Sequence, residues 1–183
     1  MSTIVAIVAS PRKNGNSDTI VGAMVESAKN NGKEVKVYHL NTLTNAKGCQ
    51  ACMACKKQVG CIQKDDNAQI LKDIREAEGI ILSTPTYFGE AIGQFRLLQD
   101  RFYSFLDGTM KSNLAPGKKV AVVVSCGGGV PAANAIAEKL EKGMVNYFQC
   151  VPVGKIISAG NAPDEASKNK ALLEEAAAIG KKL

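Results

Sequence analysis

The sequence lacks an apolar run long enough to cross a membrane. Its longest runs, such as Val120–Val124, have the length of a strand, whereas a membrane-spanning helix needs about 20 apolar residues. The first apolar stretch, Thr3–Ala9, has no basic residue before it and leads directly into a polar loop, which is unlike a secretory signal. We therefore expect a cytoplasmic protein with no membrane partner.

Aromatic residues are also few, since they make up 5% of the chain and include no tryptophan. The net charge of +6 would suit a nucleic-acid partner, but no series of base-stacking aromatics accompanies the lysines. The lysines are instead interspersed with glutamates, as in Glu138–Lys142. We therefore expect no nucleic-acid binding, and we interpret the charge as a solvated basic surface or a weak preference for anionic ligands.

Histidine occurs once, and His39 lies at the end of a predicted strand, where we expect a structural role. The six cysteines are therefore the candidates for metal or redox chemistry. Thiols stay reduced in the cytosol, so structural disulfides are the less suitable explanation for these cysteines.

Apolar runs and amphipathic segments alternate along the 183 residues, a length that suits one domain, 1–183. Most strand-like runs are apolar without alternation, as expected of strands buried on both faces. The predicted strands are Ile4–Ala9, Glu34–Leu40, Gly79–Thr84, Lys119–Cys126 and Val151–Ala159. The predicted helices are Ser17–Asn30, Asn67–Glu76, Ile92–Leu106, Val130–Asn146 and Asp164–Lys182.

This alternation predicts an α/β fold, with a five-stranded parallel sheet and helices on both faces. The usual strand order is then 2-1-3-4-5, and a ligand binds outside the carboxyl ends of the strands, beside the first and the third. The segment at about 41–66 is much longer than the usual loop of roughly 2–6 residues. It contains four of the six cysteines, and we interpret it as an insertion in the domain.

The loop after the first strand has the composition of a phosphate site. It is polar, contains Gly15, and leads into an amphipathic helix, whose first turn offers unpaired N–H groups and a positive dipole end. The alternative is a polar turn with a helix N-cap at Asn16 or Ser17, which stabilises by about 1 kcal/mol. The candidate binding residues are Ser10, Arg12, Asn16, Ser17, Asp18 and Thr19.

Two further loops follow predicted strands that end at the same edge of the sheet. After the third strand, a proline fixes the turn, a glycine permits close backbone approach, and two aromatics offer a stacking surface. The alternative for that loop is a turn whose aromatics cover the core. After the fourth strand, Gly127, Gly129 and Ala132 match G-x-G-x-x-A only weakly, because the dinucleotide motif normally follows a first strand. The candidate residues are Pro85, Thr86, Tyr87, Phe88 and Gly89 in the first of these loops, and Ser125, Gly127 and Gly128 in the second.

Four cysteines have the spacing C-x2-C-x2-C-x5-C. Two-residue gaps between three thiols are typical of iron–sulfur sites, whereas zinc sites more often use two separated C-x-x-C pairs. Free reactive thiols are a further alternative, and we expect Lys56, Lys57 and Lys64 to lower the pKa of these thiols. The candidate metal ligands are Cys49, Cys52, Cys55 and Cys61. We interpret Cys126 as a small buried residue, with a redox thiol as the alternative, and Cys150 has no neighbour that suggests chemistry.

Ser10–Ser17 and Thr84–Gly89 together resemble the NADPH-dependent FMN reductase and iron–sulfur flavoprotein group of flavodoxin-like proteins. The likeness extends over essentially the whole chain. It implies that the first loop holds the FMN phosphate, that Pro85–Gly89 lies along the isoalloxazine, and that the loop after the fourth strand is a third contact. It also implies one [4Fe–4S] cluster close to the FMN, held by the four cysteines.

The resemblance further implies an oxidoreductase that passes electrons between NAD(P)H, or a reduced carrier such as a ferredoxin, and a small-molecule or protein acceptor. It implies a homodimer or homotetramer, to which Ile92–Leu106 would contribute. One alternative is a cluster-free NAD(P)H-dependent flavin or quinone reductase, and another is a non-enzymatic electron carrier or thiol-metal sensor. No side chain is assigned as a catalytic acid or base, since the flavin carries the reaction.

Overall fold

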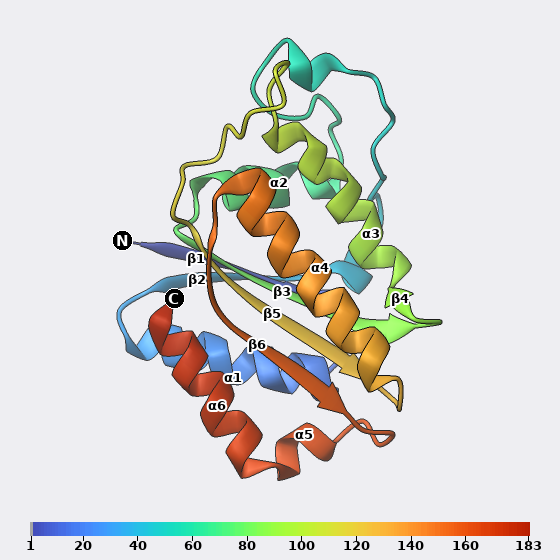
Figure 1. Ribbon diagram of the computed structural model, residues 1–183, viewed down its shortest axis with the longest axis vertical. Coiled ribbons are helices and arrows are strands. Elements are labelled where there is room, and N and C mark those ends of the chain that lie inside the picture. Colours follow the sequence, from blue (N-terminus) through green and yellow to red (C-terminus); the bar gives the residue numbers. More distant parts are fainter. Residues whose placement is uncertain (1) are drawn as a thin grey trace.

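The computed structural model describes residues 2–183. A parallel sheet of order β2-β1-β3-β5-β6 forms its centre, and the short β4 pairs antiparallel with β3 (Figure 1). The predicted α/β fold and the order 2-1-3-4-5 of its parallel strands are confirmed. The strands are β1 (Thr3–Val8), β2 (Glu34–His39), β3 (Gly79–Tyr87), β4 (Glu90–Ala91), β5 (Lys119–Cys126) and β6 (Val151–Ala159).

The three central strands are apolar throughout because helices cover both of their faces. In β1, β3 and β5 nearly every side chain is buried, as expected for a parallel sheet inside an α/β protein. β3 continues beyond the predicted end at Thr84 to Tyr87, where a turn at Phe88 and Gly89 leads back into β4. β4 was not predicted, because a strand of two residues leaves no periodic pattern in the sequence.

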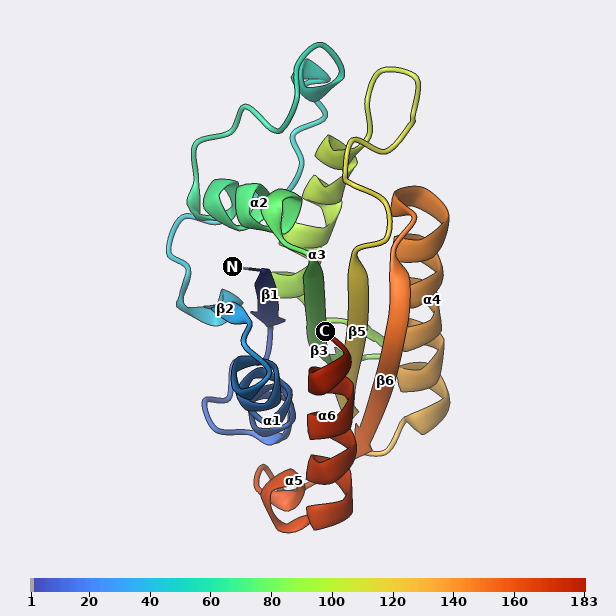
Figure 2. The same cartoon turned by 90° about the vertical axis from the view of Figure 1, so that its left-hand side faces the viewer.

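The helices lie in two layers. One face of the sheet is covered by α1 and α6, with α5 beside them, and the other face by α2, α3 and α4 (Figures 1 and 2). No helix within residues 2–183 is long and apolar enough to span a membrane. The helices are α1 (Asn16–Asn30), α2 (Asp66–Glu76), α3 (Gly93–Gln99), α4 (Val130–Phe148), α5 (Glu165–Lys168) and α6 (Lys170–Lys182), with short 3-10 turns η1 (Leu40–Thr42), η2 (Ala54–Lys56) and η3 (Asp100–Phe105).

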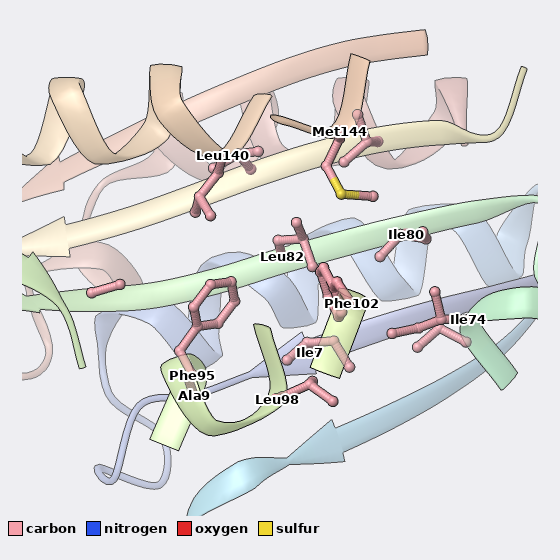
Figure 3. Close-up of a cluster of buried hydrophobic side chains, with 14 of the residues drawn as sticks. Ile7, Ala9, Ile74, Ile80, Leu82, Phe95, Leu98, Phe102, Leu140 and Met144 are labelled. Carbon is pink, nitrogen blue, oxygen red and sulfur yellow. The ribbon is translucent and has the colours of Figure 1, made fainter. Parts of the chain in front are cut away.

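The segment predicted as one helix over Ile92–Leu106 consists of α3 followed by η3. Its apolar side chains, including Phe95, Leu98 and Phe102, belong to the core between the sheet and α4 (Figure 3). The tilted rings of Phe102 and Phe105 pack with their centroids 5.4 Å apart, and Phe148 of α4 packs edge-on against both. The chain itself therefore covers the apolar face that was expected to contribute to an oligomer.

A close contact between α1 and α6 provides a test of this packing. A Cβ added at Gly180 would lie against the carbonyl oxygen of Met24 and 2.8 Å from the Met24 Cα. We expect Gly180→Ala to lower the free energy of unfolding by about 2 kcal/mol and the melting temperature by roughly 5 °C, measured by thermal and urea denaturation. Gly143→Ala in α4 is the matched control, because no atom lies within 4 Å of its added Cβ. We expect it to stabilise the protein by about 0.5 kcal/mol, and an equal loss in both variants would contradict the proposed clash.

Candidate functional site

A cleft opens at the carboxyl edge of the sheet, where the loops after β1, β3, β5 and β6 meet. Its cavity volume is about 210 Å³, and one side of it is open to solvent. The lining residues come from all four loops: Ser10, Arg12, Gly15, Asn16, Ser17, Pro85, Thr86, Tyr87, Ser125, Cys126, Gly127, Gly160, Asn161 and Pro163.

One end of the cleft has the properties of an anion site. α1 begins at Asn16 after Gly15, and in the described chain no side chain caps its first turn. The free N–H groups and the positive end of the helix dipole therefore remain for a ligand. Arg12 is the only charged residue among the lining residues that the structure describes. A doubly charged phosphate fits this end, because it would accept from the helix N-terminus and pair with the guanidinium.

Two predicted phosphate-loop residues also connect the loop to its neighbours. The Asn16 side chain donates to the Ala162 carbonyl at 2.8 Å and accepts from the Ala166 backbone N–H at 2.9 Å, which connects the loop to the segment after β6. The Ser17 and Ser125 hydroxyl oxygens lie 2.7 Å apart and connect the loop to the end of β5. The alternative of a side-chain N-cap at Asn16 or Ser17 is wrong, because Gly15 precedes the helix.

Two other predicted residues of this loop do not line the cleft. Asp18 accepts a hydrogen bond from the Asn14 backbone N–H at 2.7 Å, and its second oxygen lies 3.8 Å from His39 Nδ1. Thr19 donates its backbone N–H to the Gly15 carbonyl at 2.9 Å, within the first turn of α1. Asp18 therefore shapes the loop, and its carboxylate is held by groups other than the ligand.

The loop after β3 provides the other wall of the cleft. Pro85, Thr86 and Tyr87 line it, and Thr86 Oγ1 is buried with no hydrogen-bond partner in residues 2–183. Buried hydroxyls are normally satisfied, so this orphaned group fits a polar edge of a bound ring. Phe88 is fully exposed and, with Gly89, forms the turn at positive φ; neither residue lines the cleft, nor does Gly128 in the loop after β5.

Five lining residues were not predicted from the sequence. Gly15 and Cys126 stand beside predicted residues, whereas Gly160, Asn161 and Pro163 form the loop after β6. The fifth predicted strand ends at the same edge as the others, and its polar Gly160–Asn161 ending was the signal that could have identified this loop. A Cβ added at Gly127 would lie 3.1 Å from Asn161 Oδ1, so the loops after β5 and β6 are in close contact.

The four clustered cysteines line a second, much smaller cavity of about 20 Å³. Cys55 is buried and Cys61 partly buried, whereas Cys49 and Cys52 are exposed. The cavity lies between the cysteine loop and η3, and its other lining residues include Gln63, Arg101, Tyr103 and Ser104. Sequence spacing alone thus identified the cysteines, but not the partners that face them across the cavity.

The cysteine loop brings four thiols to one cavity, and four cysteine thiolates are the usual ligand set of a [4Fe–4S] cluster. No three His, Cys, Asp or Glu side chains within residues 2–183 are grouped to hold one metal ion, whereas tetrahedral zinc brings its sulfurs to roughly 4 Å from one another. A cubane separates its four thiolates more widely, around a common volume. The backbone also adopts left-handed conformations on either side of Cys52, at Ala51 (φ 52°) and Met53 (φ 58°), and such strained positions are common at ligand sites.

The lysines of the cysteine loop do not have the expected electrostatic effect on Cys55. Burial raises the pKa of the Cys55 thiol, and the opposing effect of Lys56 is smaller. The Lys56 ammonium instead donates to the Tyr103 and Leu106 carbonyls, at 2.8 and 2.7 Å, and lies 3.5 Å from the Tyr103 ring centroid. Lys56 thus fixes the loop to η3. The prediction of a lowered pKa is wrong for Cys55, because desolvation outweighs the neighbouring charge.

Cys126 and Cys150 are both buried, which was expected for Cys126. Burial raises the pKa of the Cys126 thiol, and it raises that of Cys150 to about 11 despite the neighbouring Lys118. A thiol of such high pKa is a poor nucleophile at neutral pH.

The cleft and the cysteine cavity lie at opposite ends of the molecule. The cleft occupies the carboxyl edge of the sheet, near the β3–β4 turn, whereas the cysteine loop extends beyond the other end of α3 and η3 (Figures 1 and 2). The expectation of a cluster next to the flavin is therefore wrong within one chain. The loop begins at the carboxyl end of β2 and extends past α3 before the chain enters α2 (Figures 1 and 2), a course that loop length alone does not specify.

The sheet order and the cleft at its carboxyl edge define the flavodoxin-like class of α/β proteins. The fold superimposes on that of the NAD(P)H:quinone oxidoreductase from Methanothermobacter marburgensis with a TM-score of 0.76, at 17% identity, over 100% of this chain and 96% of that one. Within this class, the chain belongs to the NADPH-dependent FMN reductase family, whose model matches residues 2–164. The protein is thus a flavin-dependent oxidoreductase.

Two relatives are similar in sequence. The iron–sulfur flavoprotein of Methanosarcina thermophila is 36% identical over 68% of this chain and 63% of that protein. An iron–sulfur flavoprotein of Methanocaldococcus jannaschii is 30% identical over 98% of this chain and 94% of that protein. The resemblance inferred from the two polar loops is confirmed.

Proposed function

We propose that this protein binds FMN in the carboxyl-edge cleft and a [4Fe–4S] cluster in the cysteine cavity, and passes electrons between NAD(P)H or a reduced carrier and an acceptor. The observation that carries the proposal is the pair of sites: a cleft with an uncapped helix N-terminus at one end, and four thiols around one cavity. When bound, FMN exchanges two electrons with a nicotinamide and the cluster exchanges one at a time.

The residues of the cleft bind and orient the flavin. Arg12 and the first N–H groups of α1 hold the phosphate, and the Ser17–Ser125 contact fixes the phosphate loop relative to β5. Thr86 Oγ1 offers a hydrogen bond to a polar edge of the isoalloxazine, and Tyr87, which is half exposed, provides an aromatic wall. One side of the cleft is open to solvent, and a nicotinamide or quinone substrate would approach the flavin from there.

The position of the cysteine cavity has a consequence for electron transfer. Because the two sites lie at opposite ends of one chain, direct exchange between them requires a second copy of the chain that brings a cavity to a cleft, or a diffusing carrier. We therefore keep the homodimer or homotetramer as part of the proposal. The exposed cysteines Cys49 and Cys52 place one side of the cavity at the surface, where such a partner has access.

The test is the composition and spectrum of protein purified without oxygen. We expect about one FMN, four irons and four sulfides per chain, bleaching of the flavin band by NAD(P)H or by a reduced ferredoxin, and an oligomeric mass by light scattering. FMN without iron or sulfide would contradict the cluster and favour the alternative, a cluster-free flavin or quinone reductase. Iron without flavin would contradict the assignment of the cleft.

A further inference from the structure

Arg101 is the largest fully buried side chain of the protein, and it faces the cysteine cavity. It lies in η3, is 1% exposed, and is the only charged residue that the described chain contributes to the cavity lining. Burying a guanidinium is costly unless its charge and all its donors are satisfied. The contacts of each of its nitrogens are therefore informative.

Only one side of the Arg101 fork is used within the described chain. Nη1 donates to Asp65 Oδ2 at 2.8 Å and to the Lys47 carbonyl at 3.0 Å. Nε and Nη2 are buried with no hydrogen-bond partner in residues 2–183. A buried arginine normally pairs both sides of its fork. The two unpaired donors therefore indicate an acceptor other than the neutral cysteine thiols.

The unpaired donors have sulfur atoms as neighbours. Arg101 lines the same cavity as Cys61 and the other three clustered cysteines. A cysteine that binds iron does so as the thiolate, which is a much better hydrogen-bond acceptor than the neutral thiol.

We propose that Arg101 donates hydrogen bonds from Nε and Nη2 to the Cys61 thiolate and the adjoining sulfur of the cluster, and thereby raises the reduction potential of the cluster. The inference rests on the proposed cluster. A cluster with four thiolate ligands is anionic, and it becomes more so when it gains an electron. A buried cation with N–H donors stabilises the reduced form more than the oxidised one, and hydrogen bonds to sulfur are among the determinants of these potentials.

A purely structural role makes a different prediction. Asp65 also accepts the Lys47 backbone N–H at 2.9 Å, so Arg101 and Asp65 together close the base of the cysteine loop. If Arg101 only closed the loop, Asp65→Asn and Arg101→Gln would have the same effect. If Arg101 acts on the cluster, they shift the potential in opposite directions, because one removes a negative charge and the other a positive one.

The experiment measures iron and sulfide per chain and the cluster midpoint potential, by EPR-monitored titration of the anaerobically purified holoprotein. We expect Arg101→Gln to lower the equilibrium constant for one-electron reduction of the cluster about tenfold, which lowers the midpoint potential by about 59 mV. Arg101→Lys keeps the charge but loses the fork, and we expect it to lower the potential less. Asp65→Asn is expected to raise it. Arg96→Gln is the matched control, because Arg96 lies in α3 and pairs at the surface with Asp100, and it should leave the potential unchanged.

The outcomes separate the two levels of the proposal. A wild-type protein that contains no iron would overturn both the cluster and the role of Arg101. If the wild type contains the cluster and its midpoint potential is unchanged in both Arg101→Gln and Arg101→Lys, the role of Arg101 alone is overturned. Downward shifts of equal size in Asp65→Asn and Arg101→Gln would also overturn it. Should Arg101→Gln lose its iron, the potential of Arg101→Lys decides.

Discussion

Replacing Arg12 and Ser17 together by alanine is expected to weaken FMN binding by about 3 kcal/mol, or roughly 100-fold. The double variant removes the only charge that the described residues bring to the cleft and a hydroxyl beside the uncapped start of α1. Hydrogen bonds to a charged group contribute more than neutral ones, so the loss falls on the phosphate. The measurement is quenching of flavin fluorescence when the apoprotein is titrated into FMN.

Riboflavin and a neighbouring lysine provide the controls for this prediction. Riboflavin lacks the phosphate, so its affinity should be nearly the same for the wild type and the double variant. Lys13→Ala removes a charge from the same loop, but Lys13 is exposed and does not line the cleft, so FMN affinity should change little. A double variant that binds FMN as tightly as the wild type would refute the assignment of the anion site to this loop.

The sheet was predictable because its signals are local and strong. β5 and β6 have the predicted bounds, and the ends of β1 and β2 each lie within one residue of their own predicted bounds. Strands buried on both faces consist of continuous Val and Ile runs, and the crossover rule then fixes their order with few alternatives. The helices were less regular than predicted, since α3 changes to 3-10 geometry at Asp100 and a break at Asn169 separates α5 from α6.

The cleft was predictable only in part because its residues come from loops with different kinds of signal. The loops after β1 and β3 have marked polar or Pro/Gly composition, and most of their predicted residues do line the cleft. The loop after β6 follows an edge strand whose alternation is weak, so Asn161 was not predicted as a cleft residue. Nor does composition show that the Asn16 side chain is held by Ala162 and Ala166, 146 and 150 residues further along the chain.

The sequence also did not predict which cation faces the cysteine thiols. Spacing identified the four thiols, and charge in the sequence suggested that nearby lysines act on them. In the structure the nearest lysine in sequence, Lys56, is directed to backbone carbonyls, whereas the cation that faces the thiols is Arg101, 40 residues beyond Cys61. Tertiary contacts decide which charge matters, because burial strengthens an interaction that solvent would screen at the surface.

Replacing Cys52 by serine is expected to remove nearly all iron and sulfide while FMN binding is retained. Serine is a much poorer ligand for iron than a thiolate, and three cysteines leave one iron of the cubane without its ligand. The flavin is unaffected because the cysteine cavity and the cleft share no lining residue and lie at opposite ends of the chain. Iron, sulfide and flavin quantitation on anaerobically purified protein measures both effects.

The same variant separates the one-electron and the two-electron activities. We expect reduction of a one-electron protein acceptor such as a ferredoxin to fall at least about tenfold, whereas reduction of a quinone by NAD(P)H needs only the flavin and continues. Cys150→Ser is the control, because Cys150 is buried away from the cavity, and it should keep its iron. If both activities fell together in Cys52→Ser while FMN stayed bound, the quinone reaction would also depend on the cysteine cavity, and the division of labour proposed for the two sites would be wrong.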